Sequence, residues 1–112
     1  MENTENVVIF ITTGTDEEAR QVGKALLKDR YAACVNIITN VDSLFWWHDK
    51  LDNAQESLVI VKSKSSLLHE IVRAVKEVHS YETPEIVALP IIGGNPDYLE
   101  WIGKEVQHDT GK

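Results

Sequence analysis

The chain has 112 residues and a mass of 12.6 kDa, which suffices for one hydrophobic core and is too little for two. Residues 1–112 are therefore expected to form a single domain. Eighteen Asp and Glu residues against eleven Lys and Arg residues give a formal net charge of -7. This charge repels a phosphate backbone, so nucleic acid is not an expected partner.

The apolar stretches are short, and the first residues are acidic and polar. The longest stretches, 7–11 and 86–92, fall far short of the roughly 18–20 apolar residues of a membrane span. Residues 1–6 lack the basic and apolar regions of a secretory signal. We therefore expect a cytoplasmic protein with no membrane partner. The single cysteine, Cys34, excludes an intrachain disulfide and a Cys-x-x-Cys metal site.

The first half of the chain predicts a strand, a helix and a long bent strand. Residues 7–12 form a β-branched apolar run before Gly14, typical of a strand buried on both faces. Thr15 and Glu18 form a capping box ahead of apolar residues at helical spacing, which predicts a helix over 16–29. Residues 32–39 and 42–47 predict one strand broken near Asn40. Polar residues at 48–50 and 52–53 predict the turn that follows.

The second half predicts two strands and two helices. A strand over 56–63 is expected to pair antiparallel with the strand before it, as a long hairpin. Ser63, Ser65 and Ser66 offer N-caps to a helix that ends near His79. Residues 86–89 predict the fourth strand, which two glycines at 93–94 end. Asn95 followed by proline then predicts the start of a last helix.

This order of elements predicts an α+β fold of the ferredoxin-like βαββαβ type. Two helices lie on one face of an antiparallel sheet, and a C-terminal helix follows. Three of the strands are apolar on both faces, and Phe45, Trp46 and Trp47 add large apolar side chains. We infer an oligomer in which the sheets pack on or extend one another. The alternative is that the C-terminal helix alone covers the second face.

Two regions carry side chains suited to binding. Cys34 is either a small buried hydrophobe or a soft thiolate ligand for copper(I) or zinc. The segment 79–85 places an imidazole, a phenol and two carboxylates on a loop that Pro84 stiffens, which is what a binding site needs. The alternatives are a cationic His79 favoured by the helix C-terminus, and hydrogen bonds from Tyr81 and Glu82 to free backbone groups. The other histidines, His48, His69 and His108, are expected at the surface.

Glu56 and Lys62 share one face of the third strand, because they are six residues apart in an element of period two. Lys62 either extends its stem over apolar surface or binds an anion or a carbonyl. The sequence has no nucleophile and base pair, no Gly-rich phosphate loop and no HExxH motif. It therefore predicts no catalytic residue and no enzyme.

Many of these residues recur, in the same order, in a known family. They are Ala33–Ile37, Ser43, Phe45–Trp47, Glu56, Leu58, Lys62, His79–Ile86, Pro90, Gly94, Tyr98, Leu99 and Trp101. Over nearly its whole length the chain resembles the CutA divalent-cation tolerance family. The resemblance implies a ferredoxin-like homotrimer built by edge-to-edge contact of long hairpins. That assembly agrees with the uncovered sheet face inferred from the strands.

The resemblance further implies a role in tolerance of copper and other divalent metals. Cys34, His79 and Glu82 fall where metal ligation has been proposed in the family. We expect Cys34 to supply the soft donor, His79 the imidazole, and Glu82 a carboxylate or an outer partner. Copper is the expected metal, with zinc and other divalent cations as alternatives. The three donors form one site only if folding or a neighbouring subunit brings them within ligand distance.

The resemblance also implies a ligand-binding cleft between subunits. Its expected lining residues are Glu56, Lys62, Tyr81, Glu82 and Trp47. This cleft supports an alternative function, a trimeric ligand-sensing and signal-transduction module similar in outline to the PII proteins. The chain also departs from the family pattern, with Ser80 in place of a frequent proline and His48-Asp49 in place of a frequent Glu-Gly turn.

Overall fold

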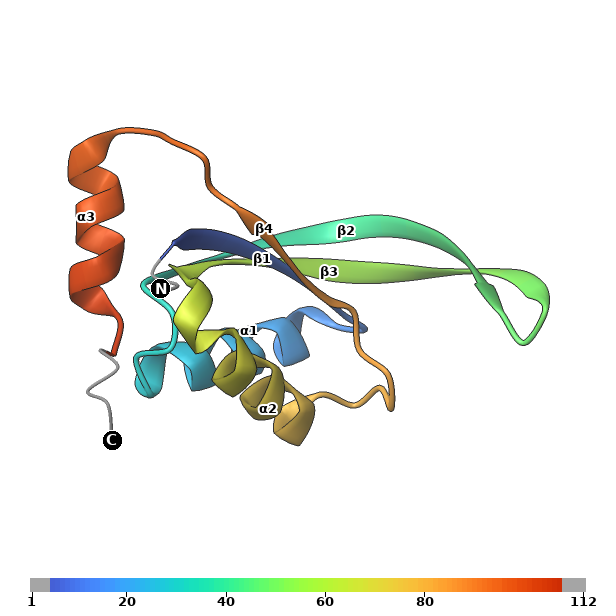
Figure 1. Cartoon of the computed structure of the whole chain (residues 1–112). Helices are drawn as coiled ribbons and strands as arrows, with labels where there is room; N and C mark the ends of the chain where they lie inside the picture. Colours follow the sequence, from blue (N-terminus) through green and yellow to red (C-terminus); the bar gives the residue numbers. More distant parts are fainter. Residues whose placement is uncertain (1–4, 108–112) are drawn as a thin grey trace.

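A computed structural model of the chain describes residues 5–107, which form one four-stranded antiparallel sheet with helices packed around it (Figure 1). The elements are β1 (Asn6–Thr13), α1 (Asp16–Lys28), β2 (Cys34–Trp47), β3 (Lys50–Lys64), a short 3-10 helix η1 (Ser65–Leu67), α2 (Leu68–Val78), β4 (Ile86–Pro90) and α3 (Pro96–Glu105). The strand order is β2-β3-β1-β4, and every pairing is antiparallel. This arrangement confirms the ferredoxin-like α+β fold predicted from the sequence.

The core lies between the sheet and the two helices α1 and α2, which cover the same face (Figure 1). Alternate residues of β1, namely Val7, Ile9 and Ile11, point into it because side chains of a strand alternate between faces. Helix α1 begins as predicted, since the Thr15 side chain accepts a hydrogen bond from the Glu18 backbone N–H at 3.1 Å. The predicted Asn95 cap of α3 is present in the same form.

The hairpin of β2 and β3 is the longest feature of the fold and projects beyond the helices (Figure 1). The pairing register shifts between Ile38 and Val41, and Asn40 there has a positive φ of 61°. The bend predicted near Asn40 is therefore a β-bulge. The register also places Glu56 and Lys62 on the same face of β3, as predicted.

Two local predictions were wrong. Residues 52–53 lie inside β3 and not in the turn, because His48 and Asp49 alone reverse the chain, with φ values of 51° and 64°. Two consecutive residues of positive φ make a tight hairpin turn, so pairing resumes at once. The serines do not cap α2 either: η1 precedes it, and the Ser63 hydroxyl in β3 donates to the Tyr31 carbonyl.

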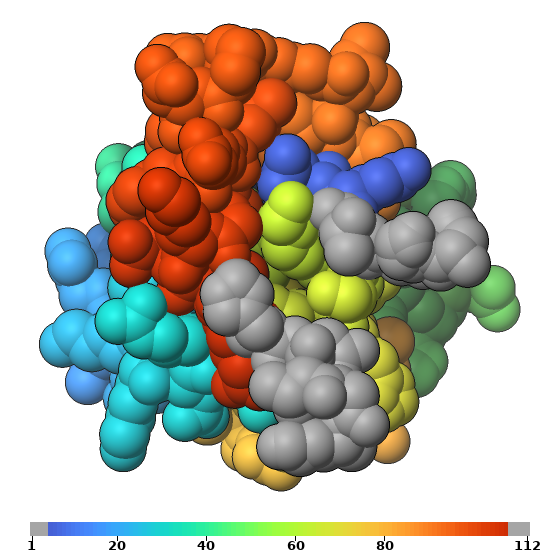
Figure 2. Space-filling view, turned by 60° about the vertical axis from the view of Figure 1, so that its left-hand side comes forward, coloured from blue at the N-terminus to red at the C-terminus, as the bar shows by residue number. Residues whose placement is uncertain are grey.

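The second face of the sheet stays largely uncovered in a single chain. Ile38, Val87 and Leu89 on this face are 44–47% exposed. Helix α3 covers only the end near Lys64, where a Cβ at Gly103 would lie 3.2 Å from the lysine Cε atom. Figure 2 shows α3 beside the segment that joins α1 to β2. No helix within residues 5–107 is long and apolar enough to span a membrane.

Candidate functional site

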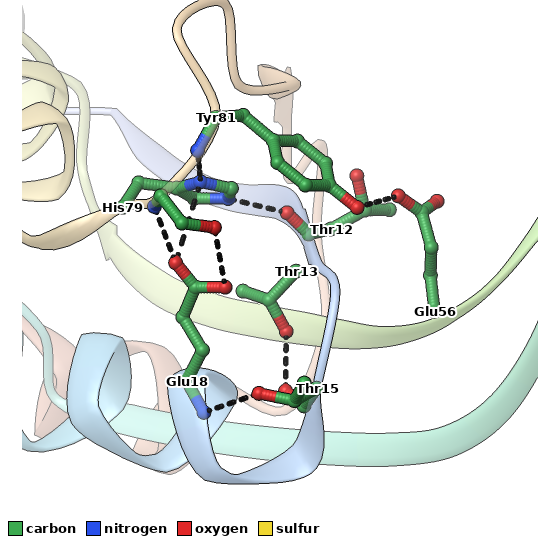
Figure 3. A network of polar contacts seen from close by, with 8 residues as sticks. Thr12, Thr13, Thr15, Glu18, Glu56, His79 and Tyr81 are labelled. Atoms are coloured by element: carbon green, nitrogen blue, oxygen red, sulfur yellow. Dashed lines mark hydrogen bonds and ion pairs between the residues drawn. The ribbon is translucent and has the colours of Figure 1, made fainter.

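The loop after α2 turns back toward the end of β1 and the start of α1, and His79 anchors it there (Figure 3). The His79 side chain is fully buried. Its Nδ1 accepts a hydrogen bond from the Tyr81 backbone N–H at 3.0 Å. Nε2 therefore carries the proton and donates to the Thr12 carbonyl at 2.7 Å. Both ring nitrogens are therefore already used within the chain.

Glu18, from the first turn of α1, holds the same loop (Figure 3). Its carboxylate accepts hydrogen bonds from the Ser80 backbone N–H and from the Ser80 hydroxyl, the latter at 3.1 Å. It also lies 3.7 Å from the His79 Nδ1 atom. Of the two hydrogen bonds of a capping box, the one from the Glu18 N–H to Thr15 is present. The Glu18 side chain bonds to Ser80 in place of the Thr15 backbone N–H. The loop is fixed to α1 by charge-assisted hydrogen bonds.

Tyr81 connects this loop to the hairpin. Its hydroxyl donates to the Glu56 Oε2 atom at 2.8 Å (Figure 3), and its ring centroid lies 4.8 Å from that of His79. Burial raises the pKa of Tyr81 to about 12, and the hydrogen bond and charge of Glu56 add to the shift. Tyr81 therefore stays a hydrogen-bond donor throughout the physiological pH range.

A cavity of about 800 Å³ opens between this loop and the hairpin. It is lined by Thr12, Asp42, Ser43, Leu44, Phe45, Trp47, Asp52, Glu56, Tyr81, Glu82, Thr83 and Glu85. The size is that of a small-molecule site. Four of the five residues expected to line a cleft, namely Trp47, Glu56, Tyr81 and Glu82, are here together, and Lys62 is not.

The three expected metal donors do not converge within one chain. Cys34 pairs with Lys62, which pairs with Val8, whereas His79 bonds to Thr12. Val8 and Thr12 are four residues apart in β1, which is about 13 Å along the strand. Cys34 lies two strands away from β1, which adds about 10 Å across the sheet. Cys34 is therefore far from Thr12, the residue that His79 contacts. Within residues 5–107, no group of three or more His, Cys, Asp and Glu side chains could hold a metal ion. These donors do not fit a metal site made by a single chain.

Cys34 and Lys62 instead form a small cluster at the other end of the sheet. The Cys34 thiol lies 3.8 Å from the Asn36 Oδ1 atom, and the Lys62 ammonium donates to the same oxygen. Burial raises the pKa of Tyr98 on α3, and its contact with the Cys34 side chain adds to the shift. His48 and His69 are exposed as predicted, and His108 lies outside the described residues.

Sequence reasoning missed the part that Glu18, Asp42 and Asp52 play in the site. Glu18 had a sufficient local explanation as a capping residue, and no local pattern indicates that its carboxylate reaches residue 80. Asp52 lies on the same face of β3 as Glu56, whereas Asp42 pairs with Gln55 on the other face, and both residues border the cavity. Such placement depends on tertiary contacts, which spacing along the chain does not reveal.

Comparison with known proteins identifies the family. The sequence profile described as CutA1 divalent ion tolerance protein matches residues 7–105. The chain belongs to the CutA1 family. Divalent-cation tolerance protein CutA of Archaeoglobus fulgidus is 43% identical over 99 residues, which cover 88% of this chain and 96% of that protein.

Further relatives come from plants. Protein CutA 1, chloroplastic, of Oryza sativa is 38% identical over 97 residues, or 87% of this chain. This CutA1 chain spans about half the length of its curated plant relatives, 55% in the rice protein. The crystal structure of CutA1 from Oryza sativa superposes with a TM-score of 0.91 at 35% identity, covering 96% of this chain and all of that one. Sequence and fold therefore agree on the family.

Proposed function

We propose that this protein acts in tolerance of divalent cations as a homotrimer. The observation that carries the proposal is the agreement of sequence and fold, over nearly the whole chain, with proteins named for divalent-cation tolerance. The role is one of binding and not of catalysis. The cytoplasmic location predicted from the sequence stays a prediction.

The uncovered sheet face supports the trimer. Ile38, Val87 and Leu89 remain nearly half exposed on a face that α1 and α2 do not cover. Exposed apolar side chains gathered on one face are typical of an interface between chains. Trp46 and Leu51, a cross-strand pair on the projecting hairpin, are each 70% exposed and form a separate apolar surface on the other face of the hairpin. Packing of three such faces and hairpins would bury them.

Copper is the proposed metal, and a neighbouring subunit is the proposed source of the missing ligands. The thiol of Cys34 is partly exposed and suits copper(I). The His79 imidazole is buried with both nitrogens bonded inside its own chain, so the ligands that join Cys34 would come from other groups, such as Glu82 of a neighbouring chain. Glu82 is exposed and lines the cavity, so its carboxylate is accessible to a neighbouring chain.

Native mass spectrometry of the purified protein, with and without stoichiometric copper, tests the proposal. We expect a trimer that gains about one copper per chain, with the gain lost in Cys34→Ser. The matched control is Ser66→Ala, a similar exchange of one small side chain at an exposed position. A monomer contradicts the assembly, and a trimer that takes up no copper contradicts the metal. Growth of a copper-sensitive host that expresses the chain then tests tolerance itself.

The cavity favours a second function, that of a ligand-sensing module. A space of about 800 Å³ with aromatic walls and the hydrogen-bonded pair of Tyr81 and Glu56 is larger than a metal ion needs. Lys62, expected from the resemblance to line the cleft, does not line this cavity, so its substitution does not test the cavity within one chain. Substitutions at Glu56 or Tyr81 address it directly.

A further inference from the structure

One wall of the cavity is a loop that is attached from outside the cavity. Residues 81–83 and 85 of this loop line the cavity, and the Tyr81 hydroxyl reaches Glu56 on the hairpin. Within the described chain, residues 79–85 between α2 and β4 belong to no helix or strand. Contacts made by side chains therefore set the place of Tyr81 and of its neighbours in the loop.

Glu18 and His79 supply these contacts from the side of α1 and β1 (Figure 3). The Glu18 carboxylate accepts hydrogen bonds from the Ser80 N–H and hydroxyl. The His79 Nδ1 atom accepts from the Tyr81 N–H, and Nε2 of the same ring donates to the Thr12 carbonyl. The Glu18 side chain is 12% exposed and that of His79 is closed to solvent, and neither residue lines the cavity. A neighbouring subunit would leave these contacts in place, because one chain already closes them to solvent.

These contacts hold two consecutive residues, and the turn before α1 leaves room for the second. The backbone N–H groups of Ser80 and Tyr81 are both bound by side chains, and the Tyr81 ring packs against the ring of His79 with centroids 4.8 Å apart. A Cβ at Gly14 would lie 3.2 Å from the Tyr81 hydroxyl oxygen, so glycine leaves the space in which that hydroxyl donates to Glu56. The direction of the Tyr81 side chain is thus set by contacts behind the cavity wall.

We propose that Glu18 and His79 are positioning residues, which fix this loop and bind neither metal nor ligand themselves. They hold Tyr81 within reach of Glu56, and they hold Glu82 beside the cavity. For copper uptake the inference rests on the function proposed above, and it adds to that site a residue, Glu18, that lies outside the cavity. It also gives His79 a role different from the imidazole donor that the resemblance implies. Loss of either residue should displace the loop although no ligand atom is removed.

Hydrogen exchange of backbone amides, followed by NMR on the full metal-free chain, tests the positioning role. In Glu18→Ala and in His79→Ala we expect both loop amides, of residues 80 and 81, to exchange about tenfold faster, because the loop loses hydrogen bonds that hold it. Glu18→Ala keeps the backbone N–H that Thr15 caps, so the start of α1 is retained. The matched control, Glu17→Ala, removes a charge from the same turn of α1 at an exposed position and should leave both amides unchanged. Amides of the β1–β3 ladder are the internal reference for overall stability.

Two further readouts separate a positioning imidazole from a metal donor. His79→Asn places a side-chain oxygen near the former Nδ1 position, so it should restore slow exchange of the Tyr81 amide. Copper(I), added at one equivalent per chain, is a diamagnetic probe and should leave the NMR signals of both His79 ring nitrogens unchanged. Native mass spectrometry should find as much copper in His79→Asn as in the wild-type protein.

Three results overturn the inference. One is loop exchange that stays unchanged in Glu18→Ala and His79→Ala, or that rises equally in Glu17→Ala. Another is equal acceleration of the β1–β3 ladder, which would mean a general loss of stability. The third is a shift of a His79 ring signal on addition of copper(I), which would make the imidazole a donor. A wild-type protein that takes up no copper contradicts the copper function alone, because the exchange rates that decide the inference are measured without metal.

Discussion

Gly14 and Tyr81 provide a stability test of the site geometry. A Cβ at position 14 would lie 3.2 Å from the Tyr81 hydroxyl oxygen, tighter than an ordinary contact. The nearest ring carbon, Cε1, would lie at an ordinary 3.6 Å. Gly14→Ala therefore displaces the hydroxyl that donates the 2.8 Å hydrogen bond to Glu56. In a Tyr81→Phe background the oxygen is absent, and the same methyl group should fit.

Two opposing contributions set the expected magnitude. Replacing glycine by alanine stabilises a protein by about 0.4–1 kcal/mol where the backbone conformation permits it, because the unfolded chain loses freedom. Losing a hydrogen bond to a charged group costs about 1.5–3 kcal/mol. Because Tyr81 is 37% exposed, we use the lower end of that range. Gly14→Ala should then destabilise the wild-type protein by about 0.5–1 kcal/mol and stabilise the Tyr81→Phe protein by about 0.4–1 kcal/mol.

Urea denaturation of the four proteins at one fixed protein concentration measures this coupling as a double-mutant cycle. Gly93→Ala is the control, since a Cβ there meets nothing within 4 Å and should have the same effect in both backgrounds. An equal effect of Gly14→Ala in the two backgrounds would refute the placement of the Tyr81 hydroxyl over Gly14. The bond to Glu56 would then need another explanation.

Three further predictions concern pH, the hairpin turn and the core. The pKa of Tyr81 is raised to about 12 in the folded chain, so between pH 10 and 12 only the unfolded chain releases this proton. The free energy of unfolding should therefore fall as the pH rises through this range. Tyr81→Phe should make that fall less steep in urea denaturation. Asp49→Gly should relieve a φ of 64° and raise stability by up to about 1 kcal/mol, whereas Asp52→Gly inside a strand should lower the melting temperature. Ile9→Val in the core should cost about 0.5–1.5 kcal/mol in urea denaturation, while Ile92→Val, at a 99% exposed position, should change little.

The fold was predictable because its determinants are local. The Thr15 cap, the bulge at Asn40 and the Asn95 cap are each specified by a few neighbouring residues. The errors arose where two local signals competed. Polar residues at 52–53 are typical of a turn, but the tight turn at 48–49 had already reversed the chain, and pairing with β2 then fixed them in β3.

The site was predictable only where its residues are consecutive. His79, Tyr81 and Glu82 share one loop, so their proximity follows from the sequence. That Glu56 would join them and Lys62 would not depends on the register, because Glu56 lies at the hairpin side of β3 and Lys62 six residues toward α3. Spacing along a strand fixes the face on which a residue lies but not the neighbour that will cover it.

The internal hydrogen bonds of His79 change how metal-binding experiments should be interpreted. Because His79 fixes the loop through Thr12 and the Tyr81 backbone, His79→Ala should loosen every residue on that loop, whether or not the imidazole binds a metal. A loss of copper in that variant therefore does not identify a ligand. Cys34 lies at the other end of the sheet from that loop, and its thiol contacts the Asn36 and Tyr98 side chains there. Loss of copper in Cys34→Ser, at unchanged stability, is the result that identifies a donor, and it should appear only in the assembled protein if the ligands come from two chains.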